Sequence, residues 1–250
     1  MKLSGKTILL TGATGGLGRA IAKELASRGA HLVLSSRREE ELAQMASALP
    51  GDGHRYVVAD LAEPGAAERL VADAGEIHGI ILNAGDRAHG PVDELPAEQI
   101  ERVIRVNFEA PAQMTRAVAP ALRARGEGHL VFIASLAGKA AAGRHILYGA
   151  TKAGLRSFAL SLRLDLSRDG VGVSIVNPGF IRDAGMFAES GAKPPMNLGT
   201  SSPEEVGEAV ADAIEGDKAE IDVAPLRQRE LANFAHRFPH VAARFSGGVS

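Results

Sequence analysis

The sequence predicts an α/β protein built on a doubly wound parallel sheet of about seven strands, with helices on both faces in a three-layer αβα arrangement. Short runs rich in β-branched residues and leucine alternate with longer, alanine-rich amphipathic stretches. Most of the short runs lack polar alternation, which is typical of strands buried on both faces. The strand-helix-strand order therefore favours right-handed crossovers of the Rossmann type.

Each element follows from a local pattern. The predicted strands are the short apolar runs Thr7–Leu10, His31–Leu34, Tyr56–Val58, Ile80–Leu82, Leu130–Ala134, Val173–Val176 and Ile221–Val223. The predicted helices are the amphipathic stretches Leu17–Arg28, Glu39–Leu49, Pro64–Asp73, Pro96–Arg125, Tyr148–Arg168, Pro203–Glu215 and Leu226–Arg244. Gly29 and Gly170 follow helices, where glycine commonly ends them. Ser202 and Pro203 offer a cap and a proline at the first helical position, and Pro239 should kink or break the last helix.

Composition excludes several classes of protein. The chain has 250 residues, 45% of them hydrophobic, and a net charge of -2, so no overall basic field points to nucleic acid. It has no cysteine, which removes disulfides and thiolate chemistry and fits a reducing cytoplasm. Its eight histidines show no metal-site spacing. No apolar run approaches the roughly 18 residues of a membrane span. We expect a cytoplasmic protein without a metal site or a transmembrane span.

The turn after the first strand carries phosphate-binding chemistry. It reads T-G-A-T-G-G-L-G-R from residue 11 to residue 19 and lies between a predicted strand and a predicted helix. Glycines let the backbone approach a pyrophosphate, and the helix N-terminus offers free N–H groups to the anion. The glycine spacing differs from G-x-G-x-x-G, and glycine can also serve a tight turn alone. We expect a dinucleotide here, bound by Gly12, Thr14, Gly15, Gly16, Leu17 and Gly18.

The end of the second strand predicts which dinucleotide binds. An acidic residue at this place would bind the ribose 2′-hydroxyl of NAD, but no acid lies between Leu32 and Arg38. Arginine recognises phosphate with a planar, permanently charged fork. The sequence therefore favours NADP(H) over NAD(H), with Arg37 on the 2′-phosphate and Ser36 or Thr14 assisting. The alternative is a solvated basic helix start, which the helix dipole would disfavour.

A tyrosine and a lysine share one face of a predicted helix. Tyr148 and Lys152 are four residues apart, so their side chains lie one above the other. Tyrosine has a pKa near 10, too high for easy proton exchange at neutral pH. A nearby ammonium stabilises the phenolate and would bring the tyrosine pKa towards the range where acid-base catalysis works best. The pair also fits a capped helix with an exposed lysine.

Taken with six further motifs, this pair makes the chain resemble the short-chain dehydrogenases/reductases. The resemblance covers about residues 3–224, in order. The motifs that carry it are Thr11-Gly12-x-x-x-Gly16-x-Gly18, Asp60-Leu61, Asn83-Ala84-Gly85, Asn107, Ser135, Tyr148-x-x-x-Lys152 and Asn177-Pro178-Gly179. Each motif also fits a local structural role, such as a cap or a helix bend, but the ordered set is specific.

The resemblance implies an oxidoreductase that interconverts a ketone or aldehyde and an alcohol, with the hydride supplied by the nicotinamide cofactor. It implies that Tyr148 is the general acid or base and that Ser135 binds the carbonyl oxygen. Lys152 would hold the nicotinamide ribose and lower the tyrosine pKa, and Asn107 would support a water in a proton relay. The further cofactor contacts that it implies are Asp60 at the adenine, Leu61, Asn83, Ala84, Gly85, Pro178, Gly179 and Ile181.

Other functions are compatible with some of the same residues. A non-catalytic NADP-binding sensor could use the same fold, although a sensor could discard Tyr148 and Lys152. A sugar epimerase or dehydratase is disfavoured because such chains usually need an added substrate domain. The resemblance also implies a homodimer or homotetramer.

The substrate side of the pocket is less regular. Residues 179–201 contain glycines, prolines and apolar side chains that suit a lid over a partly apolar ligand. A lipophilic ketone or secondary alcohol is favoured, although Arg182 and His145 would suit an acidic group. Asp183 stands where the family often has a threonine near the nicotinamide carboxamide, a contact that the backbone of Ile181 could still provide. The candidate substrate residues are Leu136, Ala137, His145, Met186 and Phe187.

The chain is expected to divide near Pro225. Residues 1–225 would form one nucleotide-binding domain that includes the substrate loop 179–201, and residues 226–250 a helical tail. The tail carries Phe234 and Phe238 near one helical face. Packing on its own domain or on a sister subunit is the favoured interpretation, with pocket shaping and shallow membrane contact as alternatives.

Overall fold

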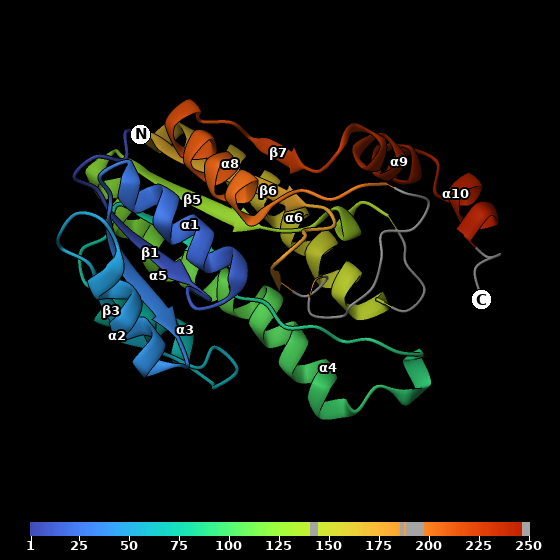
Figure 1. The fold of residues 1–250 in the computed structure, drawn as a ribbon, viewed down its shortest axis with the longest axis horizontal. Coiled ribbons are helices and arrows are strands. Elements are labelled where there is room, and N and C mark those ends of the chain that lie inside the picture. Colours follow the sequence, from blue (N-terminus) through green and yellow to red (C-terminus); the bar gives the residue numbers. More distant parts are fainter. Residues whose placement is uncertain (141–144, 186–187, 189–197, 247–250) are drawn as a thin grey trace.

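A single parallel sheet forms the centre of the molecule (Figure 1). The computed structural model describes residues 1–140, 145–185, 188 and 198–246. Within these ranges the sheet has seven strands in the order β3-β2-β1-β4-β5-β6-β7, and every neighbouring pair is parallel. The strands are β1 (Thr7–Thr11), β2 (His31–Ser36), β3 (Arg55–Val58), β4 (Gly79–Leu82), β5 (Gly128–Ile133), β6 (Val171–Pro178) and β7 (Glu220–Val223). The predicted doubly wound parallel sheet is confirmed.

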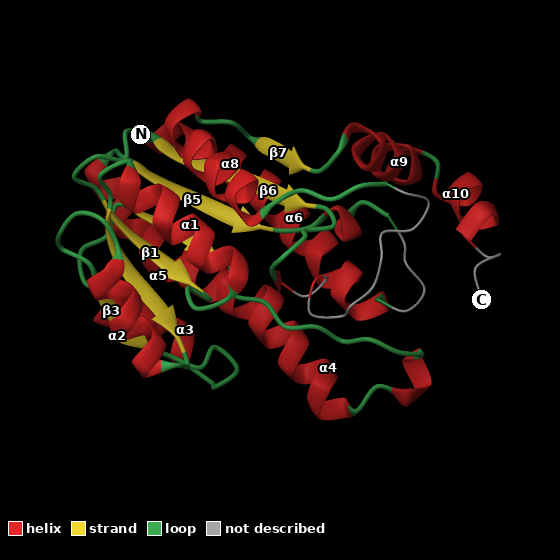
Figure 2. Ribbon diagram, viewed as in Figure 1, coloured by secondary structure: helices red, strands yellow, loops and turns green. Residues whose placement is uncertain are grey.

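Helices cover both faces of this sheet (Figure 2). They are α1 (Gly16–Ser27), α2 (Glu39–Ala48), α3 (Ala66–Asp73), α4 (Ala97–Ile104), α5 (Ala110–Arg125), α6 (Ile146–Leu166), α8 (Pro203–Gly216), α9 (Leu226–Arg237) and α10 (Pro239–Ser246). Short turns are η1 (Val92–Glu94), η3 (Leu136–Gly138) and η4 (Ser167–Asp169), each 3-10 helical, and η2 (Arg105–Glu109), which is π-helical.

The core has two halves separated by the sheet. α1, α2 and α8 pack on one face, where Ile21 and Val210 join Ile8 of β1. α3, α5 and α6 pack on the other face, where Met114 joins Leu9 of β1. Successive β1 side chains thus enter opposite apolar layers, which is why this strand lacks polar alternation. At ~25 cal/mol per Å² of apolar surface, such burial is the dominant stabilising contribution.

Two local signals act as the sequence predicts. Ser202 and Glu205 form a capping box at the start of α8: the Ser202 Oγ accepts the Glu205 N–H at 3.2 Å, and the Glu205 side chain accepts the Ser202 N–H at 2.5 Å. In the tail, α9 ends at Arg237 and α10 begins at Pro239, so the proline breaks the helix.

The predicted helix Pro96–Arg125 is helical throughout, from Ala97 to Arg125. The feature that the sequence did not predict is the π-helical turn η2, which joins α4 to α5. Pro111 has no N–H to donate to the carbonyl of Asn107, four residues earlier, and a wider turn accommodates that loss. Two helix starts also differ from expectation. α3 begins at Ala66, after Gly65 adopts a left-handed φ of 73°, and α6 begins at Ile146, which places Tyr148 inside its first turn.

In the described part of the chain, no helix combines the length and apolar character needed to cross a membrane.

Candidate active site

The predicted site residues meet in one cavity at the carboxyl ends of the strands, where β1 and β4 diverge in chain order. Its volume is about 540 Å³. The predicted residues that line it are Gly12, Thr14, Gly15, Gly16, Leu17, Gly18, Ser36, Arg37, Asp60, Leu61, Asn83, Ala84, Gly85, Ser135, Tyr148, Lys152, Pro178, Gly179 and Ile181. Residues far apart in the sequence thus form one continuous wall.

The candidate substrate residues are placed differently. Leu136 is buried, Ala137 is half-buried and His145 is exposed. None of these three is among the described residues that line the cavity. Met186 and Phe187 lie outside the described residues.

The glycine loop is packed tightly against the turn after β4. Gly12 has a left-handed φ of 64°, and a Cβ added to it would lie 2.9 Å from the Ala84 Cα and 3.0 Å from the Asn83 Nδ2. A Cβ on Gly18 would collide with the Gly12 carbonyl. These two glycines therefore serve close backbone packing as well as any ligand.

The Thr11 hydroxyl joins the two turns. It accepts the N–H groups of Asn83 and Ala84, each at 3.0 Å, and donates to the Ile81 carbonyl at 3.2 Å. The Asn83 amide in turn donates to the carbonyls of Thr11 at 2.9 Å and Gly12 at 3.1 Å. The sequence motif includes Thr11 but does not reveal this role, because the partners of Thr11 lie about seventy residues away.

The N-terminus of α1 is suited to an anion. Gly15 precedes the helix in an extended conformation, and no side chain caps the first turn. The first N–H groups of a helix have no partner within it, and the helix dipole adds a partial positive charge. With no acidic residue in the first turn, this end of α1 can hold a phosphate group.

Two arginines follow β2 and both line the cavity. The Arg38 guanidinium donates to the Thr14 carbonyl at 2.7 Å and to its hydroxyl at 2.8 Å, and it also pairs with Glu41 at 2.9 Å. The Arg37 side chain is 61% exposed and lies 3.7 Å from an Asp60 oxygen. The sequence predicts Arg37 as the phosphate ligand but does not predict the hydrogen bonds between Arg38 and Thr14. These two residues are 24 positions apart, so their contact depends on the fold.

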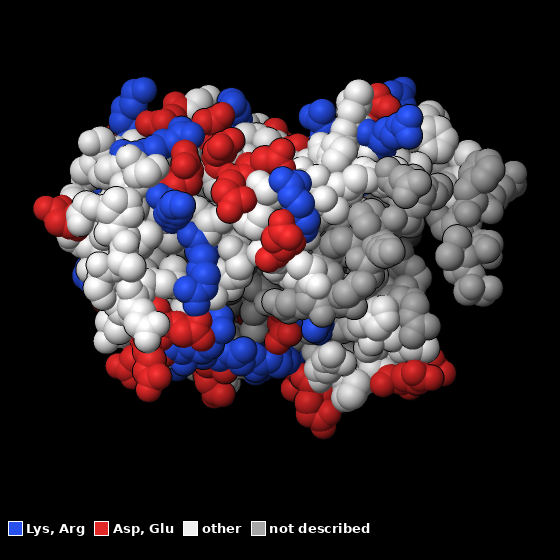
Figure 3. Space-filling view, viewed as in Figure 1, with Lys and Arg blue, Asp and Glu red and all other residues white. Residues whose placement is uncertain are grey.

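Basic side chains gather between α2 and α4, as Figure 3 shows at the lower edge of the molecule. Arg102 of α4 contributes to the cavity there, 3.8 Å from Asp60 and 2.7 Å from Asp86. Asp60 also accepts the backbone N–H of Ala62 at 2.9 Å. Arg102 and Asp86 were not predicted from the sequence.

Tyr148 and Lys152 lie together on α6, as their spacing predicts. The Lys152 Nζ is 5.7 Å from the centroid of the Tyr148 ring and donates to the Ile133 carbonyl at 2.8 Å. Burial lowers the pKa of Lys152 to about 8. Burial raises the pKa of Tyr148, and hydrogen bonding to the Ser135 side chain acts to lower it. The lowered tyrosine pKa expected from the lysine is therefore not found, because burial outweighs the opposing interactions.

Ser135 stands at the start of η3, facing this helix. Its Oγ accepts the Ala137 N–H at 3.1 Å and donates to the Pro178 carbonyl at 3.3 Å. A Cβ added to Gly138 would lie 2.8 Å from the Lys152 carbonyl carbon. The short turn η3 therefore rests directly on the backbone of α6, which brings Ser135 and Tyr148 to the same part of the cavity.

Asn107 is fully buried beside the cavity, in the π-helical turn η2. Its Oδ1 accepts the Asp86 N–H at 2.7 Å, and its Nδ2 donates to the Asp86 carbonyl at 2.9 Å and to the Thr151 hydroxyl at 3.1 Å. A Cβ on Gly85 would lie 3.6 Å from both the Asn107 Oδ1 and the Lys152 Nζ. Asn107 and Lys152 thus approach the same small space beside Gly85.

The tail contributes a residue that sequence reasoning missed. Gln228 of α9 is 5% exposed. Its Oε1 accepts the Phe180 N–H at 3.1 Å, and its Nε2 donates to the Gly199 carbonyl at 2.6 Å. Gln228 therefore connects the two described stems of the segment between β6 and α8. By contrast, Phe234 of α9 and Phe238, which follows that helix, are each 44% exposed.

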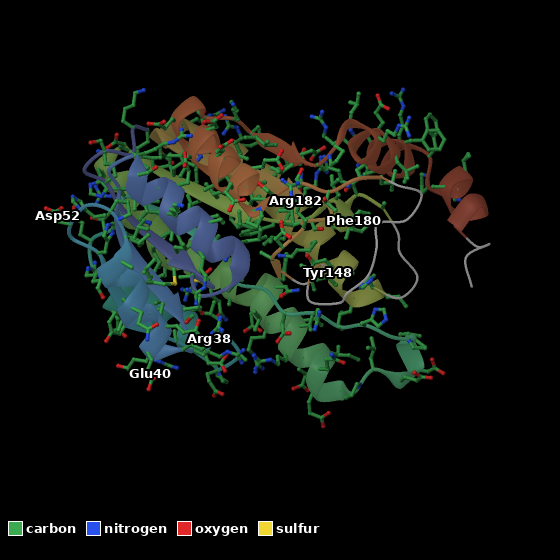
Figure 4. The ribbon with its side chains drawn as sticks, in the orientation of Figure 1. Arg38, Glu40, Asp52, Tyr148, Phe180 and Arg182 are labelled. Atoms are coloured by element: carbon green, nitrogen blue, oxygen red, sulfur yellow. The ribbon has the colours of Figure 1, made fainter. Side chains whose placement is uncertain are left out.

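Figure 4 shows how these regions are spread along the molecule. Arg38 lies near the end of β2, whereas Tyr148 lies on α6 and Phe180 just after β6. Within the described ranges, no group of three or more histidine, aspartate or glutamate residues is arranged to hold a metal ion.

Both the sequence and the fold are similar to known proteins. A family model described as short chain dehydrogenase matches residues 6–195. A protein of Nostoc sp. named ketoacyl reductase HetN is 35% identical over 227 residues, covering 88% of this chain and 79% of that protein. Human dehydrogenase/reductase SDR family member 4 is 33% identical over 188 residues, covering 72% of this chain and 67% of that protein. Among solved structures, a short-chain dehydrogenase from Sphingobium yanoikuyae in complex with NADPH matches with a TM-score of 0.81 and 29% identity, covering 97% of this chain and 94% of that one.

Proposed function

This chain belongs to the short-chain dehydrogenase/reductase family of oxidoreductases, and we propose that it is an NADP(H)-dependent carbonyl reductase. It would interconvert a ketone or aldehyde and an alcohol. The observation that carries this proposal is the shape of one cavity: Ser135, Tyr148 and Lys152 line one part of it, and Thr14 and Arg37 line another. A proton donor and a phosphate-binding end in one cavity are what such a reaction requires.

The proton chemistry follows from the surroundings of Tyr148. Because burial raises its pKa, the phenol keeps its proton at neutral pH and suits the role of general acid in carbonyl reduction. Ser135 would donate a second hydrogen bond to the same carbonyl oxygen and stabilise the negative charge that develops there. The bound nicotinamide supplies the hydride. Asn107 would support a relay water beside Lys152, in the space next to Gly85.

The residues present fit a nicotinamide dinucleotide. The pyrophosphate would lie against the uncapped start of α1, where Gly15 and Gly16 line the cavity. Asp60 and Leu61 would lie along the adenosine. At the nicotinamide end, Ile181 and Ser201 form an isolated bridge. Its two hydrogen bonds join Ser201 to Phe180 and Arg182, the neighbours of Ile181, and do not use the N–H or carbonyl of Ile181. The Ile181 backbone would then bind the carboxamide, with Pro178 and Gly179 beside it.

A preference for NADP(H) is supported by the charges at the end of β2. Ser36 stands where an NAD-selective site would place an acid. The Arg37 guanidinium is exposed to the cavity side, and Arg38 is fixed to the glycine loop through Thr14. Both can pair with a ribose 2′-phosphate. The similar structure from Sphingobium yanoikuyae, solved with NADPH, supports the same preference.

A carbonyl on an acyl or similarly lipophilic chain is the proposed substrate class. A relative with 35% identity is named as a ketoacyl reductase. Leu136 directly follows Ser135 and is a buried apolar side chain, although it is not among the described residues that line the cavity. Leu136, Ala137, His145, Met186 and Phe187 remain candidate substrate residues.

A homodimer or homotetramer is proposed as the working assembly. Leu164 on α6 is 79% exposed and Ile104 on α4 is 42% exposed, so both helices present apolar side chains to solvent. Light scattering on the purified chain would measure its mass in solution, and a monomer at working concentration would contradict this proposal.

The loss of nicotinamide absorbance with NADPH and a panel of carbonyl compounds tests the main proposal. Turnover of a ketone or aldehyde would support it. Tight NADPH binding without turnover across a broad panel would instead favour the alternative, a non-catalytic NADP-binding sensor.

A further inference from the structure

A cluster of four charged side chains and one amide lies at the β7 end of the sheet. It contains Lys139 at the end of η3, Arg156 of α6, Asn177 of β6, and Glu220 and Asp222 of β7. We call these five residues the β7 ion cluster. The described cavity lining includes none of them, and none of them has a role in the proposed reaction.

Lys139 is the most enclosed charge in this cluster. Its side chain is 6% exposed, and its Nζ lies 2.7 and 2.8 Å from the two Asp222 carboxylate oxygens and 3.0 Å from a Glu220 oxygen. An ammonium has three N–H donors, and these contacts can use all of them. Removing one partner of a buried ion pair leaves a costly unpaired charge, so Lys139 is strongly held in place.

The remaining members complete the pairing. Arg156 donates to Glu220 through two parallel hydrogen bonds of 2.6 and 2.7 Å. The Asn177 Nδ2 donates to Glu220 at 2.6 Å and to Asp222 at 2.8 Å. Burial acts to raise the pKa of Glu220, but hydrogen bonds from Arg156 and Lys139 hold it at about 2. Two cations thus face two carboxylates.

The β7 ion cluster connects the segments that carry the proposed chemistry. Lys139 directly follows the turn that Ser135 begins. Arg156 lies on α6 four residues after Lys152 and eight after Tyr148, so the three share one helix face. Asn177 directly precedes Pro178, whose carbonyl accepts the Ser135 hydroxyl at 3.3 Å.

We propose that Lys139, held by Asp222 and Glu220, is a positioning residue that keeps Ser135 against Tyr148. The turn between Ser135 and Lys139 is only one 3-10 turn long, and Gly138 within it touches the α6 backbone. Fixing its far end at β7 therefore fixes the serine at its near end. The consequence for turnover rests on the proposed reductase function, but the placement of Ser135 can be measured without turnover.

The chain offers a direct spectroscopic test. It has no tryptophan and two tyrosines, Tyr148 and Tyr56. Tyr56 is an exposed residue of β3. In a Tyr56→Phe background, the ultraviolet absorbance of tyrosinate reports the pKa of Tyr148 alone. Because hydrogen bonding to Ser135 lowers that pKa, loss of the bond should raise it.

The other groups around Tyr148 remain unchanged in every variant. Lys152 faces it from its own helix, and His145 precedes that helix. The further charged residues that line the cavity are Arg37, Arg38, Asp60, Asp86, Arg87 and Arg102.

Ser135→Ala and Lys139→Met should each raise the Tyr148 pKa, and the double variant should raise it no further than Ser135→Ala does. Such non-additivity identifies residues that act through one another. Lys139→Arg keeps the cation and should return the Tyr148 pKa most of the way to its value in the parent protein. The matched control is Arg163→Met, which breaks an ion pair to Asp217 at 2.8 Å at the other end of α6 and should leave the pKa unchanged.

Asp222→Ala separates positioning from simple charge effects. Losing the Lys139 cation would raise the tyrosine pKa through the field alone, and losing the Asp222 anion would lower it. If Lys139 acts as a tether, both changes raise it. If Lys139→Met does not fold, as judged by circular dichroism, Asp222→Ala provides a second way to remove the ion pair and measure the Tyr148 pKa.

Three results would overturn the proposal. The first is a Tyr148 pKa that is raised in Ser135→Ala but unchanged in Lys139→Met. The second is a Tyr148 pKa that shifts in opposite directions in Lys139→Met and Asp222→Ala, and the third is a Tyr148 pKa that does not change in Ser135→Ala. With a carbonyl substrate, Lys139→Met should lower kcat about tenfold while the KM for NADPH stays the same. If no carbonyl is turned over by the unmodified chain, the proposed function fails, and the titration still decides the role of Lys139.

Discussion

The Lys152 ammonium lies 5.7 Å from the centre of the Tyr148 ring, yet it donates its hydrogen bond to the Ile133 carbonyl. The lysine is thus beside the phenol ring, and it donates its hydrogen bond to the main chain of β5. Burial moves the two pKa values apart, up for the tyrosine and down for the lysine. This arrangement favours a protonated tyrosine as the acid of a reduction.

Tyr148→Phe should abolish this proton transfer while keeping the ring in place. We expect kcat to fall by about 10²- to 10⁴-fold, the usual contribution of general acid catalysis. NADPH binding, measured by fluorescence titration, should stay within about twofold, because the phenol oxygen is one contact among many. Tyr56→Phe is the matched control, since it removes the same hydroxyl from an exposed site. A Tyr148→Phe enzyme as active as the parent would contradict the mechanism.

Arg37→Ala should weaken NADPH binding by about 10- to 100-fold and leave NADH binding nearly unchanged, because a phosphate contact is lost that NADH never makes. Arg116→Ala is the control, since Arg116 is an exposed arginine paired with Glu68. Isothermal titration with both cofactors provides the measurement. Should the unmodified protein bind NADH at least as tightly as NADPH, the proposed preference is wrong.

Ser36→Asp tests the same preference in the opposite direction. A carboxylate at the end of β2 would repel the 2′-phosphate and could accept a hydrogen bond from the ribose 2′-hydroxyl of NAD. We expect the ratio of kcat/KM for NADPH to that for NADH to fall at least tenfold. An unchanged ratio would mean that the end of β2 does not contact this part of the cofactor.

Gln228→Leu should loosen the two stems of the segment between β6 and α8. It removes the hydrogen bonds to Phe180 and Gly199 at nearly constant volume and leaves a buried N–H and a carbonyl without their partner. We expect a loss of about 1 to 3 kcal/mol in the free energy of unfolding and a higher KM for the carbonyl substrate. Gln113→Leu on the exposed side of α5 is the control. Equal stability and KM in both variants would show that the tail does not hold these stems.

His129 should make the protein sensitive to acid. Burial lowers its pKa to about 4, and its ring pairs with the Ser174 hydroxyl at 2.8 Å. Between pH 6.5 and 4 the unfolded histidine binds a proton that the folded one does not, so stability falls as the pH falls through this window. The loss is on the order of 3 kcal/mol. Denaturant unfolding should show it in the parent protein and a shallower loss in His129→Gln, and equal slopes would contradict it.

The sheet could be predicted from the sequence because its central strands are apolar on both faces. Leu9 and Leu10 pack into different apolar layers, one on each face of the sheet. The strand therefore appears in the sequence as an uninterrupted apolar run. The motif residues were also predictable, since the ends of parallel strands meet at one edge of a sheet. Their common cavity follows from that topology.

Other features depend on contacts that no local pattern reveals. The π-helical turn between α4 and α5 is explained by Pro111. A proline near a helix start is also a favourable signal, so the sequence alone does not show which effect this proline has. Lys139 and Asp222 are 83 residues apart, and either one alone resembles a surface charge. Gln228 stands in a polar stretch of the tail, where nothing local distinguishes a buried amide from a solvated one.

The hydrogen bonds of Thr11 have a consequence for how the cavity can adapt to ligands of different size. They join the glycine loop to the turn after β4, so these two walls must move as one rigid piece. The wall after β6 is held instead by the isolated bridge between Ile181 and Ser201 and by the side chain of Gln228. Because a change at Gln228 would release this wall and leave the glycine loop in place, variants that widen specificity should be sought at the β6 side.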